Sequence, residues 1–376
     1  MTDLGGKQEL DSKNSAEDGQ ATLRRSQPLA IYMEGAADKD IGKMGFGVLR
    51  YSPNPVCCVI DSEWAGRDIA ESGRSPRSAP VVANIAEAMQ KGAEVLVLGI
   101  APPGGLIPPE WLAIMDEAIA GGLCLVNGLH DLLAPRYSKL KPGQWIWDVR
   151  VEPPGLGTAS GLAGKLSNKR VLMLGTDMAI GKMTAGLELQ RGLMDQGIKA
   201  EFVATGQIGI TVTGAGIPLD AIRVDFAAGA VEREVLKYAD AEVVIIEGQG
   251  SYIHPASTSP LPLTRGSCPT HLILCHRAGQ TALKRHPEIA IPPLRAFIKL
   301  CEDVAEVCGT YPRPKTIGVA LNTSHLDESE ALRSVKATED EIGLPCTDPV
   351  RFGVQPLIIA LLGHHRRAKR RGGPHQ

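Results

Sequence analysis

The residues with the clearest chemical meaning lie in one segment, from Val171 to Gly197. It reads VLMLGTDMAIGKMTAGLELQRGLMDQG: an apolar strand, a turn between glycines, a Gly-Lys pair and a helix with apolar residues at helical spacing. Glycines let backbone N–H groups approach an anion, a helix N-terminus contributes the positive end of its dipole, and Lys182 adds a full charge. The segment therefore predicts a phosphate-binding loop.

The spacing of this loop differs from the usual P-loop in two ways. Five residues separate Gly175 from Gly181 where the common motif has four, and Met183 stands where a magnesium-binding Ser or Thr should follow the Lys. Thr184 comes one position later, which turns its hydroxyl by about 100° around a helix. The case for magnesium-dependent hydrolysis is therefore weak, and no metal ligand is assigned. Phosphate binding is expected from Gly175, Thr176, Asp177, Gly181, Lys182, Met183 and Thr184.

The longer GTDMAIGK form resembles the loop of dethiobiotin synthetase and its relatives, where GTD also opens the loop. The strand EVVIIEGQG ends in Glu247-Gly248, similar to the acidic Glu-Gly of those enzymes, and GVALN ends in Asn322, where they often contact the nucleobase. Both positions follow strands, and an open α/β sheet binds its ligands at the carboxyl ends of its strands. The resemblance implies that Asn322 contacts the nucleotide part of the ligand.

Over roughly Pro28 to Gly363 the chain resembles a family of two-domain proteins long described as having unknown function. The resemblance is carried by KRVLMLGTDMAIGKMTAGLEL, FVATGQIGI, VVIIEGQGSYIHPA, LILCHRAGQ, GVLRYSP and LVNGLHDLL. That family joins an N-terminal Rossmann-like domain to a C-terminal P-loop domain and includes D-glutamate N-acetyltransferases of D-amino-acid catabolism. It implies that the loop holds the phosphates of acetyl-CoA, the acyl donor, and that D-glutamate is the acceptor. Acyl transfer from a thioester requires neither magnesium nor phosphoryl cleavage.

Such a transfer needs a general base, because the amino group of glutamate is mostly protonated near pH 7, and donors that stabilise the tetrahedral oxyanion. The catalytic candidates in the second half are Asp177, Glu247, His254 and His276. Glu247 ends an apolar strand beside two glycines, so we interpret it either as the base or an orienting carboxylate, or as a structural partner of the loop. A single histidine more often has a structural role, which weighs against His254 and His276.

The two carboxylates of D-glutamate require cationic partners, and the planar fork of Arg binds a carboxylate at two points. Arg50 with Tyr51 in GVLRYSP and Arg265 in LTRGS are the first choices, because each lies beside apolar runs and glycines.

Short apolar runs of strand length, separated by segments of helix length, must position these residues. The runs are LAIYM (29–33), VCCVI (56–60), VLVLGI (95–100), LCLVNG (123–128), VLMLG (171–175), AEFVATG (200–206), EVVIIEG (242–248), HLILC (271–275) and TIGVALN (316–322). This alternation is typical of βαβ units and of mostly parallel sheets covered on both faces. The fold class is therefore α/β, with two tandem three-layer domains, Rossmann-like and then P-loop NTPase-like.

The domain boundaries follow from changes in composition. We expect a disordered extension over 1–27, a Rossmann-like domain over 28–150, a linker rich in Pro, Gly and Ser over 151–168, a P-loop domain over 169–363 and a basic tail over 364–376.

Composition excludes several classes of function. With 40 Lys and Arg against 42 Asp and Glu, and only 4% aromatic residues, the chain has neither the charge nor the stacking platforms of a nucleic-acid-binding protein. No apolar run approaches the ~20 residues of a membrane span. The polar N-terminus lacks the hydrophobic segment of a secretory signal, so a cytoplasmic protein is expected. We also expect the chain to form a homo-oligomer.

Two alternatives to the acetyltransferase remain open. The loop alone favours an ATP-dependent ligase or kinase similar to dethiobiotin synthetase, with Mg/ATP as cofactor. The displaced Thr184 favours a non-catalytic nucleotide-binding protein. Magnesium-dependent release of ADP would select the first, and tight binding without turnover would select the second.

Overall fold

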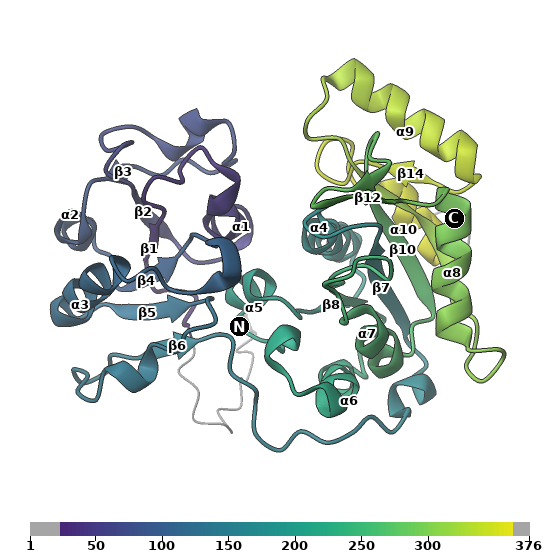
Figure 1. Cartoon of the computed structure of the whole chain (residues 1–376), viewed down its shortest axis with the longest axis horizontal. Helices are drawn as coiled ribbons and strands as arrows, with labels where there is room; N and C mark the ends of the chain where they lie inside the picture. Colours follow the sequence, from purple (N-terminus) through teal and green to yellow (C-terminus); the bar gives the residue numbers. More distant parts are fainter. Residues whose placement is uncertain (1–22, 364–376) are drawn as a thin grey trace, which may run out of the picture.

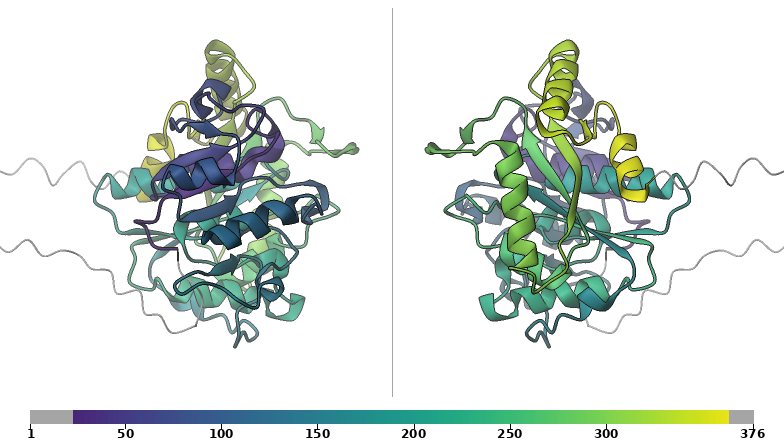
Figure 2. Two further views of the ribbon diagram at one scale, coloured as in Figure 1. Left: turned by 90° about the vertical axis from the view of Figure 1, so that its left-hand side faces the viewer. Right: turned by 90° about the vertical axis from the view of Figure 1, so that its right-hand side faces the viewer.

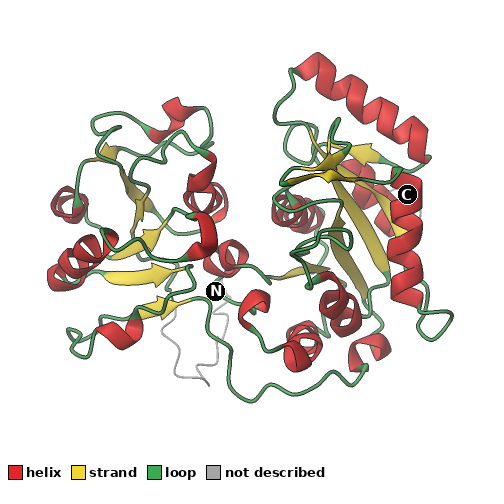
Figure 3. Cartoon of the chain, in the orientation of Figure 1, coloured by secondary structure: helices red, strands yellow, loops and turns green. Residues whose placement is uncertain are grey.

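The structure, a computed structural model, describes residues 23–363. In that range the chain forms two α/β domains, each with its own parallel sheet, and a long connection joins them (Figure 1). Helices flank both sheets, as the colouring by secondary structure shows (Figure 3). The expected α/β class with two tandem domains is confirmed.

The first sheet has the strand order of a Rossmann fold. Along its strands, alternate residues such as Leu29 and Ile31 pack with α1, whereas Ala30 and Leu96 pack with α2 and α3 on the other face. In spatial order the strands are β3 (Val81–Val82), β2 (Val56–Ile60), β1 (Leu29–Tyr32), β4 (Val95–Leu98), β5 (Cys124–Asn127) and β6 (Ile146–Asp148), and the helices are α1 (Lys43–Tyr51), α2 (Ile85–Gln90) and α3 (Trp111–Gly121). The chain builds β2 and β3 on one side of β1 and returns to β4 on the other, so the topological switch point lies between β1 and β4.

The second sheet is built around β7, with β9 inserted between β7 and β8. Its strands are, in spatial order, β14 (Cys346–Thr347), β13 (Lys315–Asn322), β10 (His271–Arg277), β7 (Lys169–Gly175), β9 (Val243–Ile246) and β8 (Ala200–Val203). Val171 and Met173 of β7 pack on one face of the sheet, whereas Leu172 and Leu174 pack on the other. The first face is covered by α4 (Lys182–Met194) and α10 (Gln355–Leu362), and the second by α6 (Val224–Leu236), α7 (Pro260–Ser267) and α8 (Leu294–Glu306). The switch point lies between β7 and β10, directly below the predicted phosphate loop.

The helices of the second domain are α4 (Lys182–Met194), α5 (Gln207–Thr213), α6 (Val224–Leu236), α7 (Pro260–Ser267), α8 (Leu294–Glu306), α9 (Glu328–Ile342) and α10 (Gln355–Leu362). Seen from the side of this domain, α8 runs along the sheet and α9 lies above it (Figure 2). A separate hairpin of β11 (Ala282–Leu283) and β12 (His286–Ala290) follows β10.

Helix α1 of the first domain packs against α5 of the second at very short range. A Cβ on Gly47 would lie 2.4 Å from Ile208 Cγ2, so only glycine permits this approach. The Tyr51 hydroxyl donates to Glu188 Oε1 of α4 at 3.0 Å. One hydrophobic core therefore runs from the first sheet through α1 into the second domain.

The N-terminal segment and the linker between the domains differ in detail from what the composition predicts. Residues 1–22 of the expected extension and the whole basic tail, 364–376, lie outside the described range. Gln27 already belongs to the folded domain, because Asn54 Nδ2 donates to its carbonyl at 3.0 Å. The expected linker is held in place as well, since Ser160 N and Oγ donate to Glu232 Oε2 of α6 at 2.7 and 2.9 Å.

Candidate functional site

The loop after β7 has the backbone geometry of an anion-binding nest. Ala179 and Gly181 adopt left-handed conformations with φ of 54° and 103°. A Cβ on Gly175 would lie 2.8 Å from Ile180 Cδ1 and 3.0 Å from Lys182 Cδ, so glycine is needed there for the tight turn. Within residues 23–363, the N–H groups of Ala179, Ile180 and Gly181 donate to no protein acceptor. The loop therefore offers donors to a ligand at the N-terminus of α4.

Lys182 is buried beneath this loop. Its Nζ donates to the carbonyl of Asp177 at 2.7 Å, and burial lowers its pKa to about 8. A buried ammonium with one neutral acceptor is stabilised by any anion that enters the nest. Loop and lysine together therefore form the phosphate site that the sequence predicts.

Asp177 is a structural residue of the loop. Its Oδ1 accepts from Met178 N at 2.6 Å, and its Oδ2 accepts from Gln280 Nε2 at 2.6 Å and from Lys284 N at 2.9 Å. These bonds tie the β11–β12 hairpin to the loop. Asp177 therefore positions the hairpin against the loop.

Glu247 lies directly after β9, on the other side of the loop. Its Oε2 accepts from Thr205 N at 2.8 Å and from Gly206 N at 3.1 Å, and its Oε1 accepts from no residue in the described range. Burial raises its pKa to about 7, although these two hydrogen bonds and the charge of Lys182 oppose that shift. Gly209 makes room for the carboxylate, since a Cβ there would lie 2.4 Å from Oε2.

The two candidate histidines have different surroundings. His276 Nδ1 lies 2.8 Å from Thr176 Oγ1, and burial lowers its pKa to about 4, so it supports the loop as a neutral ring. His254 Nδ1 accepts from Ala256 N at 3.1 Å, which places the proton of the neutral ring on Nε2, 3.9 Å from Asp177 Oδ1. Burial lowers its pKa, and it packs edge to face against His286. His254 is therefore a hydrogen-bond donor rather than a base.

Met183 and Thr184 face the other domain. Met183 Cε would lie 3.7 Å from a Cβ on Gly47, and Thr184 hydrogen-bonds Tyr51, whose pKa is raised by burial. The position that holds magnesium in an ordinary P-loop is here Met183, and it packs toward α1. Among the described residues no cluster of three or more His, Cys, Asp or Glu could hold a metal ion.

The structure brings Asn322 to the loop but not Arg265. Asn322 Nδ2 donates to Ile180 O at 3.2 Å, which fixes the turn. Arg265 instead donates to the carbonyls of Val304 and Ala305 at the end of α8, at 2.9 and 3.4 Å. That helix end precedes β13, so Arg265 lies at the amino ends of the strands, opposite the loop. Its guanidinium caps the C-terminal end of α8.

Arg50 and Tyr51 lie at the domain contact. The Tyr51 hydroxyl is committed to Glu188, and Arg50 is half-buried in the last turn of α1, with no ion pair in residues 23–363. These two residues are thus close to α4 but not in the nest itself.

Two cations near the loop were missed by sequence reasoning, Lys43 and Arg150. Lys43 opens α1 at the switch point of the first sheet, and Arg150 follows β6 and pairs with Asp220 of the second domain. Arg150 Nε also donates to Gly128 O at 2.8 Å. Both residues follow strands, and this is visible in the sequence. Which strand ends lie beside the second domain depends on the packing of α1 against α5, which the sequence does not reveal.

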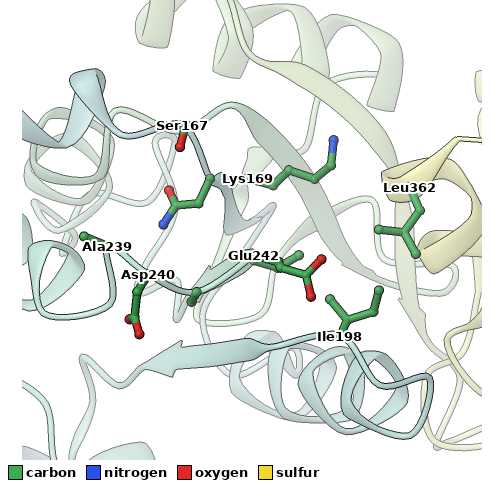
Figure 4. A pocket seen from close by; sticks show the side chains of 10 residues that line it. Ser167, Lys169, Ile198, Ala239, Asp240, Glu242 and Leu362 are labelled. Atoms are coloured by element: carbon green, nitrogen blue, oxygen red, sulfur yellow. The ribbon is translucent and has the colours of Figure 1, made fainter.

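An open cavity of about 610 Å³ lies elsewhere. Lys169, Ile198 and Glu242 line it at the starts of β7, β8 and β9, and Leu362 closes one side (Figure 4). This is the amino edge of the sheet, away from the loop, so its size says nothing about the chemistry at the carboxyl edge. No helix in residues 23–363 is both long and apolar enough to cross a membrane.

Fold and site define a two-domain α/β protein with a Rossmann-like unit and a P-loop unit. Family models agree: residues 62–152 match the Rossmann-like domain and residues 157–358 the P-loop domain of DUF1611, both described as domains of unknown function. The chain belongs to the DUF1611 family. A crystal structure of a DUF1611 family protein from Anabaena variabilis is 47% identical, with a TM-score of 0.87 over 90% of this chain and 99% of that one.

Two relatives with names that state an activity are also similar. A D-glutamate N-acetyltransferase of Tritonibacter scottomollicae is 33% identical over 339 residues, which cover 89% of this chain and 98% of the relative. A D-glutamate N-acetyltransferase of a Pseudoalteromonas species is 34% identical over 284 residues, 74% of this chain and 84% of the relative.

Proposed function

We propose that this protein is an N-acetyltransferase that moves the acetyl group of acetyl-CoA to the amino group of D-glutamate, as a step of D-amino-acid catabolism. The observation that carries the proposal is a phosphate nest whose metal position is occupied by a domain contact, next to a buried glutamate with a pKa of about 7. The names of the two relatives support the same reaction.

The nest suits coenzyme A better than a reacting nucleotide. The pyrophosphate of coenzyme A needs backbone donors and a cation, which Ala179, Ile180, Gly181 and Lys182 supply. Phosphoryl transfer would in addition need magnesium, and Met183 and Thr184 are turned toward α1. Binding without phosphoryl chemistry is the better match.

Glu247 is suited to the role of general base. A base works best when its pKa lies near the working pH, and burial brings Glu247 to about 7. In the proposed step Glu247 takes a proton from the acceptor ammonium through Oε1, and the amine attacks the thioester carbon. The C–N bond forms, and the nitrogen gives up its second proton as the C–S bond breaks. Coenzyme A leaves as a thiolate that takes up this second proton, and the proton held by Glu247 passes to water.

His254 supports the developing oxyanion in this scheme. Its Nδ1 is occupied by the Ala256 N–H, so Nε2 carries the proton and can donate it in a hydrogen bond. A fixed donor at an oxyanion typically accelerates acyl transfer by about 10²- to 10³-fold.

Thiol release from acetyl-CoA tests the proposal. We expect release with D-glutamate, much less with L-glutamate, and no change on addition of EDTA. Lys182→Met should raise KM for acetyl-CoA about 10- to 100-fold, since one charge-assisted contact to a phosphate is removed. Lys165→Met, an exposed lysine outside the site, is the matched control. Magnesium-dependent release of ADP without thiol release would contradict the proposal.

A further inference from the structure

Lys43 of the first domain lies where an open α/β sheet binds its ligands. It is the first residue of α1, which follows β1, and β1 borders the switch point with β4. Gly45 N donates to Gly99 O, just after β4, at 2.8 Å, which fixes the start of the helix across this point. The side chain of Lys43 is exposed and makes no hydrogen bond or ion pair within residues 23–363.

Arg285 reaches the same region from the second domain. It follows Lys284 in the turn between β11 and β12, and Lys284 N donates to Asp177 of the phosphate loop at 2.9 Å. The Lys284 ammonium lies 3.8 Å from Asp40 Oδ2 in the short helix η1 (Asp40–Gly42), which immediately precedes Lys43. The hairpin turn thus connects the phosphate loop to the start of α1.

The electrostatics agree with this placement. Lys43 is accessible to solvent, yet its pKa is lowered by desolvation and by the charges of Arg285 and Arg150. Arg285 also helps to lower the pKa of His254, after burial and His286. Lys43 therefore lies within electrostatic range of Arg150 and Arg285, and Arg285 lies within range of His254.

These three cations are not equivalent. Arg150 is paired with Asp220 and donates to Gly128 O, so its charge is balanced and its side chain is fixed. Lys43 and Arg285 have no carboxylate partner in the described part of the chain. Two such cations from opposite domains repel each other unless an anion lies between them.

We propose that Lys43 and Arg285 form the carboxylate receptor for the acceptor, one from each domain, and that they select a dicarboxylic amino acid. This inference rests on the proposed function. The phosphates of the donor have their own partners in the nest and Lys182, so a second pair of cations matches the second anionic reactant. Asp220, which holds Arg150, is close enough to Glu247 to help raise its pKa, so an acceptor held here lies near the base.

Steady-state kinetics of Lys43→Ala and Arg285→Ala test the receptor. Each variant should raise KM for D-glutamate about 10- to 100-fold, as expected for one charge-assisted contact, and leave KM for acetyl-CoA within about twofold. The preference for D-glutamate over D-glutamine, which lacks the side-chain carboxylate, should fall by a similar factor. Lys91→Ala and Arg333→Ala, both exposed and outside the cleft, are the matched controls.

Calorimetric titration of D-glutamate into the CoA-saturated protein separates this inference from the proposed function. Binding to the wild type that weakens at least 10-fold in both variants supports the receptor even if no acetyl group is transferred. Equal binding in wild type and variants, or no binding to the wild type, overturns it. A rise in KM for acetyl-CoA with an unchanged KM for D-glutamate also overturns it, because the two cations would then hold the donor.

Discussion

Burial moves the pKa values of two oppositely charged residues toward neutrality. Lys182 falls to about 8 and Glu247 rises to about 7, in each case chiefly through desolvation. The two side chains differ in their hydrogen-bond partners. Lys182 faces the nest and one carbonyl, whereas Glu247 keeps one oxygen without a protein donor among residues 23–363.

The pH dependence of turnover should report Glu247. A base must be ionised to accept a proton, so kcat/KM should rise as the pH increases through about 7. Glu247→Gln should lower kcat by about 10²-fold or more and remove this inflection, with KM for acetyl-CoA nearly unchanged. Glu201→Gln, a half-buried glutamate at the amino edge of the sheet, is the control that should keep both rate and profile. Full turnover in Glu247→Gln would exclude Glu247 as the general base.

The same shift predicts how stability depends on pH. The pKa of Glu247 is higher in the folded chain than in the unfolded one, so the folded state binds more protons between about pH 4.5 and 7. This contribution to stability is complete below that range and is lost as the pH rises through it. From pH 5 to pH 8 the wild type should therefore lose about 1 to 3 kcal/mol of unfolding free energy that the Glu247→Gln variant does not lose. Urea unfolding at pH 5 and at pH 8 measures the difference in unfolding free energy between the variant and the wild type. The same difference at both pH values would contradict a raised pKa for the buried Glu247 carboxyl.

Individual site residues could be predicted from the sequence where the residues of a site lie in one continuous segment. Glycines, Lys182 and the strand before them predict the nest, and an acid after an apolar strand predicts Glu247. Lys43 begins the helix after a strand, but no local signal relates it to Arg285, because their proximity depends on how two domains pack. Arg265 was chosen for its neighbours in sequence, and the structure uses it to cap α8.

Among the secondary-structure elements, α5 and the residues just before it determine the position of the Glu247 carboxylate. Its Gly209 leaves room for the Glu247 carboxylate, and Thr205 and Gly206 just before the helix donate to it. This explains the ATGQIGI segment physically, since a side chain at Gly209 would displace the carboxylate.

Gly209→Ala tests this arrangement. The added Cβ would lie 2.4 Å from Glu247 Oε2, so the carboxylate must shift and kcat should fall at least about 10-fold, with CoA binding retained. Alanine favours a helix over glycine, so lost activity would not reflect lost helicity. Gly157→Ala, where a Cβ meets open space, is the matched control. An unchanged kcat would show that Glu247 tolerates displacement and is not the base.

Long apolar strands were predictable and short elements at the edges were not. VCCVI forms β2 over Val56–Ile60 as expected, because a fully buried strand needs a continuous apolar run. The two-residue strands β3 and β14 pair only at sheet edges and leave almost no pattern. Helix α1 was missed because KMGFGVLRY is rich in glycine, which usually opposes helix formation.

The glycines of α1 are explained by tertiary packing. A Cβ on Gly45 would lie 2.4 Å from Met33 Sδ, and one on Gly47 would lie 2.4 Å from Ile208 Cγ2. The helix fits between the first sheet and α5 only without those side chains. Local propensity is here outweighed by the contact between domains.

For the whole molecule, the central feature is that two switch points meet. The start of α1 lies at one, the phosphate loop at the other, and the Lys284–Asp40 contact joins them. Each sheet alone would bind a ligand at its carboxyl edge, and their juxtaposition lets two reactants share one site. A transferase needs this arrangement, because its donor and acceptor must be held together.

Removal of metal should leave the enzyme active. Met183 packs toward Gly47 of α1, and acyl transfer from a thioester needs no magnesium, so turnover in excess EDTA should equal turnover in magnesium within about twofold. Initial rates of thiol release measure this directly. A loss of more than about 10-fold that zinc or magnesium restores would mean that a metal takes part.

A crystal structure with coenzyme A and N-acetyl-D-glutamate is the most direct test of the account. We predict that the pyrophosphate lies in the nest of Ala179–Lys182, that the amide nitrogen lies within hydrogen-bond reach of Glu247 Oε1, and that the carboxylates contact Lys43 and Arg285. Coenzyme A bound away from the nest, or a product nitrogen remote from Glu247, would contradict acyl transfer at this site.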